Sequence, residues 1–380
     1  MLFDYETLKL IWWVLVGVLL IGFAITDGFD MGACALLPLL GKTDDERRVV
    51  INTVGPHWEG NQVWFVTAGG ALFAAWPAVY AAAFSGFYWA MLLVLFALFF
   101  RPVGFDYRSK LTNTKWRKAW DVGLIAGGVV PSLVFGVAFG NLLLGVPFQH
   151  DELLRPSYDG NLFGLLNPFG LLCGIVSLGM LSMHGAVWVQ LRSQGDVERR
   201  AQGYAQLLAV VTLVAFALAG IWLSLGIDGY RIISQPALDA LPNPLAKEVE
   251  VAAGAWLSNY SVYPLTMLAP ITGFIGLIGV FLMAGRGRTG WSFLFSALAL
   301  AGIIATAGVS MFPFVMPSSL SPNSSLTLWD AASSHLTLNV MTIAAIIFVP
   351  TILGYTLWCY RSLWAKISVE YIQDNDYSSY

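Results

Sequence analysis

Charge is the scarcest feature of this sequence. Only 11% of its 380 residues are Asp, Glu, Lys or Arg, whereas a soluble domain carries about 25%. Hydrophobic residues make up 57%, and the mean hydropathy is +0.69. A chain this poor in charge is expected to fold in lipid. Its net charge of −3 also argues against a nucleic-acid partner, because such partners require a basic surface.

Cysteine and histidine are few as well. The three cysteines, Cys34, Cys173 and Cys359, stand in apolar runs without the spacing of a metal site or a disulfide framework. Of the four histidines, His57 and His184 fall in expected membrane segments. For His184 the alternatives are a haem ligand and a hydrogen-bonded interior histidine. Two haems would need more inward-facing ligands, so we predict no metal site in this chain.

Apolar runs of about 20 residues predict nine membrane-spanning helices. The expected ranges are 8–27, 57–78, 80–100, 121–141, 163–190, 204–224, 262–284, 289–311 and 337–360. The first run continues to Leu40, so this helix is overlong, bent at Gly28 or Gly32, or extends beyond the bilayer. The sequence therefore predicts an all-α integral membrane protein with a single polytopic domain over residues 1–380. Long loops are expected at 225–261 and 312–336, with a short helix in KEVEVAAGAWL.

Basic residues predict the orientation. Sixteen of the 20 Lys and Arg residues fall in one set of loops between the expected helices, and four fall in the other set. Basic residues concentrate in cytoplasmic loops. We therefore expect the N-terminus in the periplasm, the C-terminus in the cytoplasm, and the two long loops in the periplasm.

The motif TDGFDMG places two carboxylates in the first helix. Asp27 and Asp30 are three residues apart and share a face. Lys42, the first basic residue of the next loop, lies roughly 18–23 Å further along a helix. The two carboxylates are therefore expected inside the bilayer. One interpretation is that they cap a helix break at Gly28, and the other is that they belong to a proton or cation path.

The second expected helix opens with the polar stretch HWEGNQ. His57, Asn61 and Gln62 are expected to form a polar entrance beside Glu59, which is either a path carboxylate or an interface residue that reaches water. Asp106 follows the third helix in FRPVGFDYRSK. It is either a path carboxylate or the partner of a surface ion pair with Arg101 or Arg108.

These acidic residues come from three consecutive helices and are expected on the cytoplasmic side. Carboxylates spaced along an inner half-channel can pass protons with little rearrangement. Further along the second helix, the stretch around Trp64, Ala68 and Gly69 predicts an apolar interior rich in small residues, which could admit dioxygen. The competing interpretation of these three residues is close helix packing.

Long strings in the sequence are similar to those of a known family. They include LIWWVLVGVLLIGFAITDGFDMG, PHWEGNQVWFVTAGGALFAAWP and MFPFVMPSSLSPNSSLTLWDAASSHLTLNVM. In these strings, and over nearly its whole length, the chain resembles subunit II of the cytochrome bd-type ubiquinol oxidases. The resemblance implies nine helices arranged as two four-helix bundles plus one additional helix, in a bacterial inner membrane.

The resemblance also implies a function. The complex would oxidise ubiquinol and reduce dioxygen to water with cytoplasmic protons, as an electrogenic oxidase of the respiratory chain. Its two b haems and one d haem would lie in subunit I, the partner, and no cofactor is expected in this chain except a structural quinone or lipid. A small single-helix accessory subunit is a further expected partner. The family's proton-path positions match Asp27 or Asp30, Glu59 and Asp106, with Arg101 beside them.

Two other classes of function are weighed against this one. A proton- or ion-coupled secondary transporter would use Asp27, Asp30 and Glu59 for coupling, and would place broken helices at matching positions of two halves. The fifth expected helix offers no charged counterpart to TDGFDMG, which disfavours a transporter. A haem-bearing oxidase subunit is disfavoured by the small number of histidines.

Overall fold

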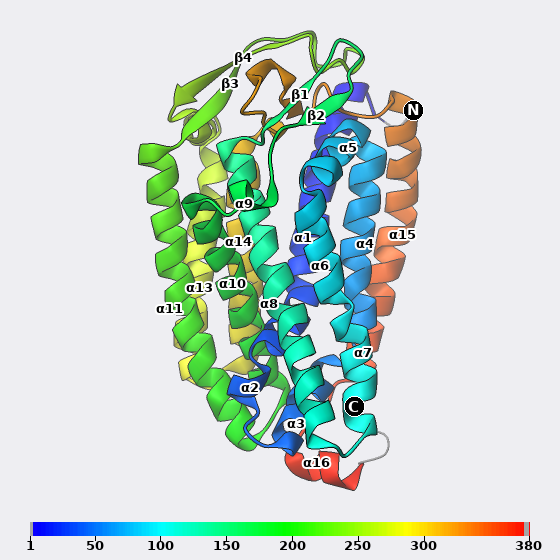
Figure 1. The fold of residues 1–380 in the computed structure, drawn as a ribbon, viewed down its shortest axis with the longest axis vertical. Helices are drawn as coiled ribbons and strands as arrows, with labels where there is room; N and C mark the ends of the chain where they lie inside the picture. The colour runs from blue at the N-terminus through cyan, green and yellow to red at the C-terminus, as the bar shows by residue number, and fades with distance from the viewer. Residues whose placement is uncertain (1–2, 376–379) are drawn as a thin grey trace.

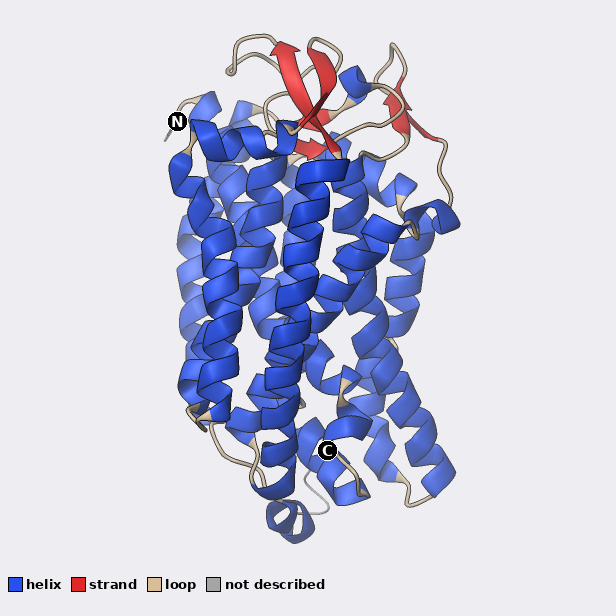
Figure 2. Cartoon of the chain, turned by 90° about the vertical axis from the view of Figure 1, so that its left-hand side faces the viewer, coloured by secondary structure: helices blue, strands red, loops and turns tan. Residues whose placement is uncertain are grey.

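The computed structural model describes residues 3–375 and 380. Long helices run side by side, and short strands gather at one end of them (Figures 1 and 2). The helices are α1 (Tyr5–Ala35), α2 (Leu37–Leu40), α3 (Asp44–Val54), α4 (Trp58–Ala75), α5 (Pro77–Gly86), α6 (Tyr88–Leu98), α7 (Phe100–Tyr107), α8 (Thr114–Leu144), α9 (Leu162–Leu165), α10 (Pro168–Arg192), α11 (Gly195–Gly226), α12 (Ser258–Val262), α13 (Leu268–Gly285), α14 (Thr289–Met311), α15 (His335–Ser362) and α16 (Val369–Asp374). The strands pair as three antiparallel hairpins, β1 (Phe148–His150) with β2 (Pro156–Tyr158), β3 (Asp228–Ser234) with β4 (Glu248–Ala253), and β5 (Phe314–Met316) with β6 (Leu326–Thr327).

Eight helical segments in the described part of the chain are long and apolar enough to cross a membrane, and the bent pair α4 and α5 makes a ninth if it is counted as one span. The protein is therefore an all-helical multi-pass membrane protein. The spans are 5–35, 88–110, 114–144, 168–192, 195–226, 264–285, 289–311 and 335–362, and the bent pair covers 58–75 and 77–86.

The third predicted helix differs from the observed one. Residues 77–86 form α5, which turns by 120° from α4, and the next spanning segment begins only at Tyr88. The predicted range 80–100 therefore joined the end of a bent helix to the start of a separate span. Hydropathy could not separate the two, because both are apolar.

Helix α1 continues without a break through the TDGFDMG motif to Ala35. Of the alternatives for this segment, the structure shows an overlong helix of 31 residues that is not interrupted at Gly28 or Gly32. These glycines serve close packing instead. A Cβ atom on Gly28 would lie 2.7 Å from the Leu181 side chain, and one on Gly32 would lie 2.1 Å from the Leu181 carbonyl oxygen of α10. Only a residue without a side chain lets two helices approach so closely.

The core forms around α10, which packs against α1, α8, α11 and α14. In its most apolar stretch, 72% of the residues are buried. Helices α13 and α14 pack tightly against each other, and α13 also contacts α11. Helix α15 lies at the edge of the molecule beside α4 (Figure 1), and only 17% of its apolar stretch is buried.

The expected loops carry the hairpins and are tied to the helix ends. The short helix expected in KEVEVAAGAWL is instead strand β4 followed by a single 3₁₀ turn, Ala255–Leu257. Glutamate and valine alternate over Glu248–Val251, and this period of two suits a strand paired with β3. Two buried lysines fasten the loops. Lys9 donates from Nζ to the carbonyls of Leu238, Ala240 and Trp329 at 2.7–3.1 Å, and Lys247 pairs with Asp330 at 2.9 Å.

Candidate functional site

The centre of the site is a buried arginine between two carboxylates of α1. Arg101 of α7 donates from Nη1 to Oδ2 of Asp27 at 2.9 Å and from Nη2 to Oδ1 of the same carboxylate. Its Nη2 also lies 3.8 Å from Oδ2 of Asp30. None of the three side chains is more than 2% exposed. A fork of two parallel hydrogen bonds is the strongest arrangement for an arginine and a carboxylate.

Helix geometry explains why α1 presents both acids to one arginine. Asp27 and Asp30 are three residues apart in a continuous helix and therefore lie on the same face. The interpretation that they cap a break at Gly28 is wrong, because α1 has no break there. Close approach of the helices also matters, since a Cβ atom on Gly127 of α8 would lie 2.8 Å from Cγ of Arg101. The arginine stem thus fits against a helix surface that lacks a side chain.

A chain of hydrogen bonds leads from the second carboxylate to α15. Asn61 of α4 donates from Nδ2 to Oδ2 of Asp30 at 2.9 Å, and its Oδ1 accepts a hydrogen bond from the Tyr360 hydroxyl. Asn61, which the sequence predicted to be part of a polar entrance, is buried. Side chains of α1, α4 and α15 are therefore joined in one chain of hydrogen bonds that ends at the Asp30 carboxylate.

Aromatic rings enclose the far end of this chain. The imidazole of His57 stacks on the ring of Tyr360, with centroids 4.5 Å apart and planes 7° from parallel. The guanidinium of Arg192 lies 3.5 Å from His57 Nε2, and its carbon lies over the rings of Trp188 and Trp364, 5.2 and 4.9 Å from their centroids. Arg192 is held in place by the carbonyls of residues 363 and 365, to which it donates at 2.8 and 2.9 Å.

The charges at the centre do not balance when both acids are ionised. Two carboxylates and one guanidinium leave one negative charge, and burying an uncompensated charge costs several kcal/mol. Asp30 Oδ1 and Arg101 Nε are buried, and among the described residues neither has a hydrogen-bond partner. One proton on this group would neutralise it, and Asp30 Oδ1 is the open atom that can take it. The arrangement can therefore hold and release a proton.

The other predicted carboxylates lie outside this buried centre. Glu59 and Asp106 are both exposed. The ion pair considered for Asp106 is not formed, since in the described structure Arg101 pairs with the α1 acids and Arg108 pairs with Asp121 and Asp44. Arg101 thus belongs to the centre and not, as its place in the sequence suggested, to Asp106.

Tyr380 lies near both exposed carboxylates. Burial, and then the nearby carboxylates of Asp106 and Glu59, raise the pKa of the Tyr380 phenol. The same ring packs against Gly55, just before α4 begins. Gln62, the remaining residue of the predicted entrance, is half-buried on α4.

The residues expected to admit dioxygen lie on the same helix but differ in their surroundings. The ring of Trp64 covers Gly22 of α1, where a Cβ atom would lie 2.5 Å from it. Ala68 is buried, whereas a Cβ atom on Gly69 would meet no atom within 4 Å. Close packing within the chain therefore accounts for Trp64 but not for Gly69.

The interpretation of His184 as an interior histidine is confirmed. Its Nδ1 lies 2.7 Å from the Ser296 hydroxyl and its Nε2 lies 2.8 Å from the Ile25 carbonyl oxygen, so both ring nitrogens have protein partners. Across the described residues, no group of three or more His, Cys, Asp and Glu side chains is placed to hold a metal ion.

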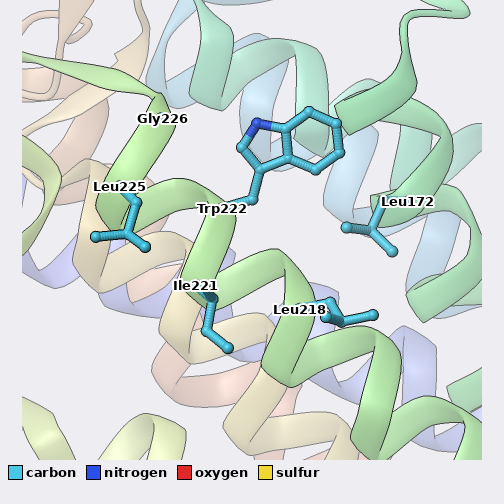
Figure 3. Close-up of a pocket in the computed structure, with 6 residues that line it drawn as sticks. All are labelled: Leu172, Leu218, Ile221, Trp222, Leu225 and Gly226. Atoms are coloured by element: carbon cyan, nitrogen blue, oxygen red, sulfur yellow. The ribbon is translucent and has the colours of Figure 1, made fainter.

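An apolar groove lies away from the buried centre, and a small void lies close to it. An apolar groove of about 520 Å³ lies between α10 and α11, near the end of α11 (Figure 3), lined by Leu172, Leu218, Ile221, Trp222, Leu225 and Gly226. A void beside Cys34 is enclosed by residues of α1, α2, α3 and α7. Neither cavity is lined by Trp64, Ala68 or Gly69.

Sequence reasoning missed Tyr360 and Arg192. Each lies near the end of an apolar helix, where aromatic and basic residues usually mark the membrane interface. The useful signal was the polar character of Asn61, because a buried amide needs partners for both its oxygen and its nitrogen. That requirement says that partners exist, but it does not say which helix supplies them.

Comparisons with known proteins agree on one family. The profile of "Cytochrome bd terminal oxidase subunit II" matches residues 8–363. The chain is 58% identical to "Cytochrome bd-I ubiquinol oxidase subunit 2" of Escherichia coli strain K12 over 377 residues, which cover 99% of this chain and 100% of the relative. It is 33% identical to "Cytochrome bd ubiquinol oxidase subunit 2" of Bacillus subtilis strain 168, over 94% of this chain and 96% of the relative. A chain in the solved structure of bd oxidase from Geobacillus thermodenitrificans has the same fold, with a TM-score of 0.69, 14% identity, and coverage of 93% and 98%.

Proposed function

The chain belongs to the cytochrome bd terminal oxidase subunit II family, and from this premise we propose that it supplies part of a path that brings cytoplasmic protons to its partner. As a member of that family it is a subunit of a bacterial ubiquinol oxidase complex of the respiratory chain, and it is a multi-pass membrane protein. Membership also implies subunit I as its partner. The proposed path uses Glu59, Asp106, Asp30, Asp27 and Arg101.

The observation that carries this proposal is the unbalanced charge at Asp27, Arg101 and Asp30. A buried group that must accept a proton to become neutral, and that has one carboxylate oxygen open, suits proton exchange better than a purely structural ion pair. A structural pair would be complete with Asp27 and Arg101 alone, since these already form the fork.

The start of α4 connects this centre to the proposed entrance. Glu59 is exposed in the first turn of α4, and two residues later Asn61 donates to Asp30. Asp106 is exposed near the end of α7, the helix that carries Arg101. Each proposed entrance carboxylate is thus joined to the centre by less than two turns of a helix. Protons would enter at Glu59 and Asp106 and reach Asp30 as the inner site.

We propose that the end of the molecule with these residues faces the cytoplasm. The loops at this end carry most of the basic residues, including those of α3 and of the turn between α7 and α8. The hairpins and the loops 225–261 and 312–336 would then be periplasmic. The contacts of α10, α11, α13 and α14 support one four-helix bundle, and those of α1, α4, α6 and α8 support a second. Helix α15 would be the additional helix.

The partner subunit is proposed to dock on α4 and α15. An exposed stripe on α4 contains Glu59, Gly60, Val63, Val66 and Gly70. A carboxylate beside small residues is poorly suited to lipid, whereas small residues favour helix contact in membranes. A Cβ atom on Gly60 or Gly70 would meet no atom of the described residues within 4 Å, which supports a stripe open to another chain. Subunit I would carry the two b haems and the d haem, and the single-helix accessory subunit would bind the pair.

The transporter interpretation loses its structural basis. It relied on a helix broken at TDGFDMG, and α1 is continuous there. The family assignment also excludes it as the primary function. An oxygen path along Trp64, Ala68 and Gly69, and a bound structural quinone or lipid, remain proposals of their own.

The proton path is tested in the intact oxidase by Asp30→Asn, Glu59→Gln and Asp106→Asn. We expect slower turnover and reduced charge separation in proteoliposomes, while haem content and the haem spectrum stay normal. Asp151→Asn is the matched control, because Asp151 is an exposed acid paired with Arg155 at the hairpin end of the molecule. If all three path variants assemble and turn over at the parental rate, the protons do not use this subunit.

A further inference from the structure

The hydroxyl of Tyr360 is attached to the proposed proton site through one amide. It donates to Oδ1 of Asn61, and Nδ2 of the same amide donates to Oδ2 of Asp30 at 2.9 Å. Tyr360 belongs to α15, Asn61 to α4 and Asp30 to α1, so the link crosses three helices. Tyr360 is not among the predicted path residues, so the proposed path gives its hydroxyl no role.

The Tyr360 hydroxyl stabilises one of the two orientations that the side-chain amide of Asn61 can take. An asparagine side chain has an acceptor end and a donor end, and either end can face a given neighbour. A carboxylate needs a donor. The Tyr360 hydroxyl can donate or accept, and here it donates to the amide oxygen, so it stabilises the orientation in which that oxygen faces α15 while the carboxylate receives the amide nitrogen. The amide nitrogen is then held toward Asp30.

The orientation of the amide determines which carboxylate oxygen is open. Asp30 Oδ2 accepts from Asn61 and faces Arg101 at 3.8 Å, whereas Oδ1 has no partner among the described residues. If the amide turned around, its oxygen would face the carboxylate and the site would favour a proton on Oδ2. An amide nitrogen that can only donate thus keeps the exchangeable position on Oδ1.

The surroundings hold the Tyr360 ring in place independently of its hydroxyl. His57 stacks on one face at 4.5 Å, and the rings of Trp188 and Phe29 meet it edge-on at 5.9 and 6.4 Å. A phenylalanine would keep these ring contacts and lose only the hydrogen bond. The contribution of the hydroxyl can therefore be separated from that of the ring.

We propose that Tyr360 is a positioning residue which, through Asn61, orients the Asp30 carboxylate and keeps its Oδ1 as the atom that exchanges protons. This inference rests on the proposed proton path, since it gives the phenol a role at that path's inner site. It also concerns the local state of Asp30, which is measurable whether or not protons pass through it.

The test measures the infrared carbonyl band of Asp30 in the intact oxidase, defined as the signal that Asp30→Asn removes. Tyr360→Phe is expected to shift this band and to lower turnover roughly two- to tenfold, the effect of losing one hydrogen bond. Tyr263→Phe is the control, because its side chain is 55% exposed and lies outside the proposed docking helices α4 and α15, and it should change neither quantity. Asn61→Leu should shift the band as well. The double variant should shift it no further than Asn61→Leu alone, because Tyr360 acts through that amide.

Replacing Tyr360 with a fluorotyrosine provides a second measurement that keeps the ring and the fold. Its more acidic hydroxyl is a stronger donor, so the band should move in the direction opposite to that in Tyr360→Phe. An unchanged Asp30 band in both variants would overturn the positioning role. A shifted band, together with parental turnover of Asp30→Asn, Glu59→Gln and Asp106→Asn, would leave the positioning role standing and refute the proton path, so the two proposals fail separately.

Discussion

Gly32 of α1 and Gly185 of α10 lie face to face with no room for a methyl group on either. A Cβ atom on Gly32 would lie 3.0 Å from Cα of Gly185, and one on Gly185 would lie 2.4 Å from the backbone nitrogen of Ala33. This contact fixes the distance between the helix that carries the two acids and the helix at the centre of the core.

Gly185→Ala should therefore destabilise the protein. The new methyl group meets backbone atoms, which cannot turn aside, and such overpacking costs about 1–3 kcal/mol. The measurement is the rate of thermal inactivation of the assembled oxidase. Gly220→Ala in α11 is the control, because a Cβ atom there would meet nothing within 4 Å. Equal inactivation rates for the two variants would contradict the importance of the contact.

Removing the arginine of the site should prevent normal assembly. Arg101→Met leaves Asp27 and Asp30 buried without a cation, and breaking a buried pair in this way costs about 3–5 kcal/mol. Arg101→Met combined with Asp27→Asn removes one charge of each sign and should recover much of the assembled complex. The amount of haem-containing complex in membranes measures both. No recovery in the double variant would show that Arg101 is needed for something other than charge balance.

Helix α3 should loosen in acid. Burial works against ionisation of Glu46, but its ion pair with Arg200 and the amides of Thr43 and Lys42 outweigh burial and hold the pKa of this carboxyl below its ordinary value of 4.5. A lowered pKa means that the stabilisation is present at neutral pH and is lost as the pH falls below 4.5. Hydrogen exchange of the α3 amides should show this loss.

Glu46→Gln is the matched variant for that experiment. The glutamine cannot ionise, so the α3 amides of this variant should exchange faster at neutral pH than those of the parental protein. The expected difference is that of a weakened helix cap, about 0.5–2 kcal/mol. The variant should also show no further change below pH 4.5 beyond the intrinsic pH dependence of exchange. A parental protein that loosens no more than this variant would exclude Glu46 as the cause.

The oxygen path is tested at Ala68, which is buried beside the helix face that we propose for subunit I. Ala68→Phe should slow dioxygen binding after flash photolysis, because a large ring fills an apolar route for a small gas molecule. Reduction of the haems by quinol should continue at the parental rate. Unchanged oxygen kinetics would exclude this route, and close packing would then explain Ala68.

The sequence was a good guide to the spans and a poor guide to their turns. The predicted range 289–311 coincides with α14, because Gly287 and the surrounding arginines interrupt the apolar run before it. At Pro77 the apolar character continues through a turn of 120°. Hydropathy reports how apolar a segment is but not the direction in which it runs.

The acidic residues of the site were predicted from the sequence, but the ion pair that they form with Arg101 was not. Asp27, Asp30 and Asn61 were recognised because polar groups in apolar helices are costly and need protein partners. Arg101 was placed near Asp106, its neighbour in sequence, whereas its observed partner Asp27 is 74 residues away. Such pairings depend on how the helices pack around glycines, and no periodicity in one helix contains that information.

The bond between Asn61 and Tyr360 has a consequence for biosynthesis, because the two residues are 299 positions apart. When the ribosome has made α1, α4 and α7, the two acids and their arginine are already in the membrane, but the amide still lacks the phenol that orients it. That phenol arrives only with α15. A nascent chain that stops before residue 360 therefore has the ion pair without the oriented carboxylate, and the site is finished only at the end of translation.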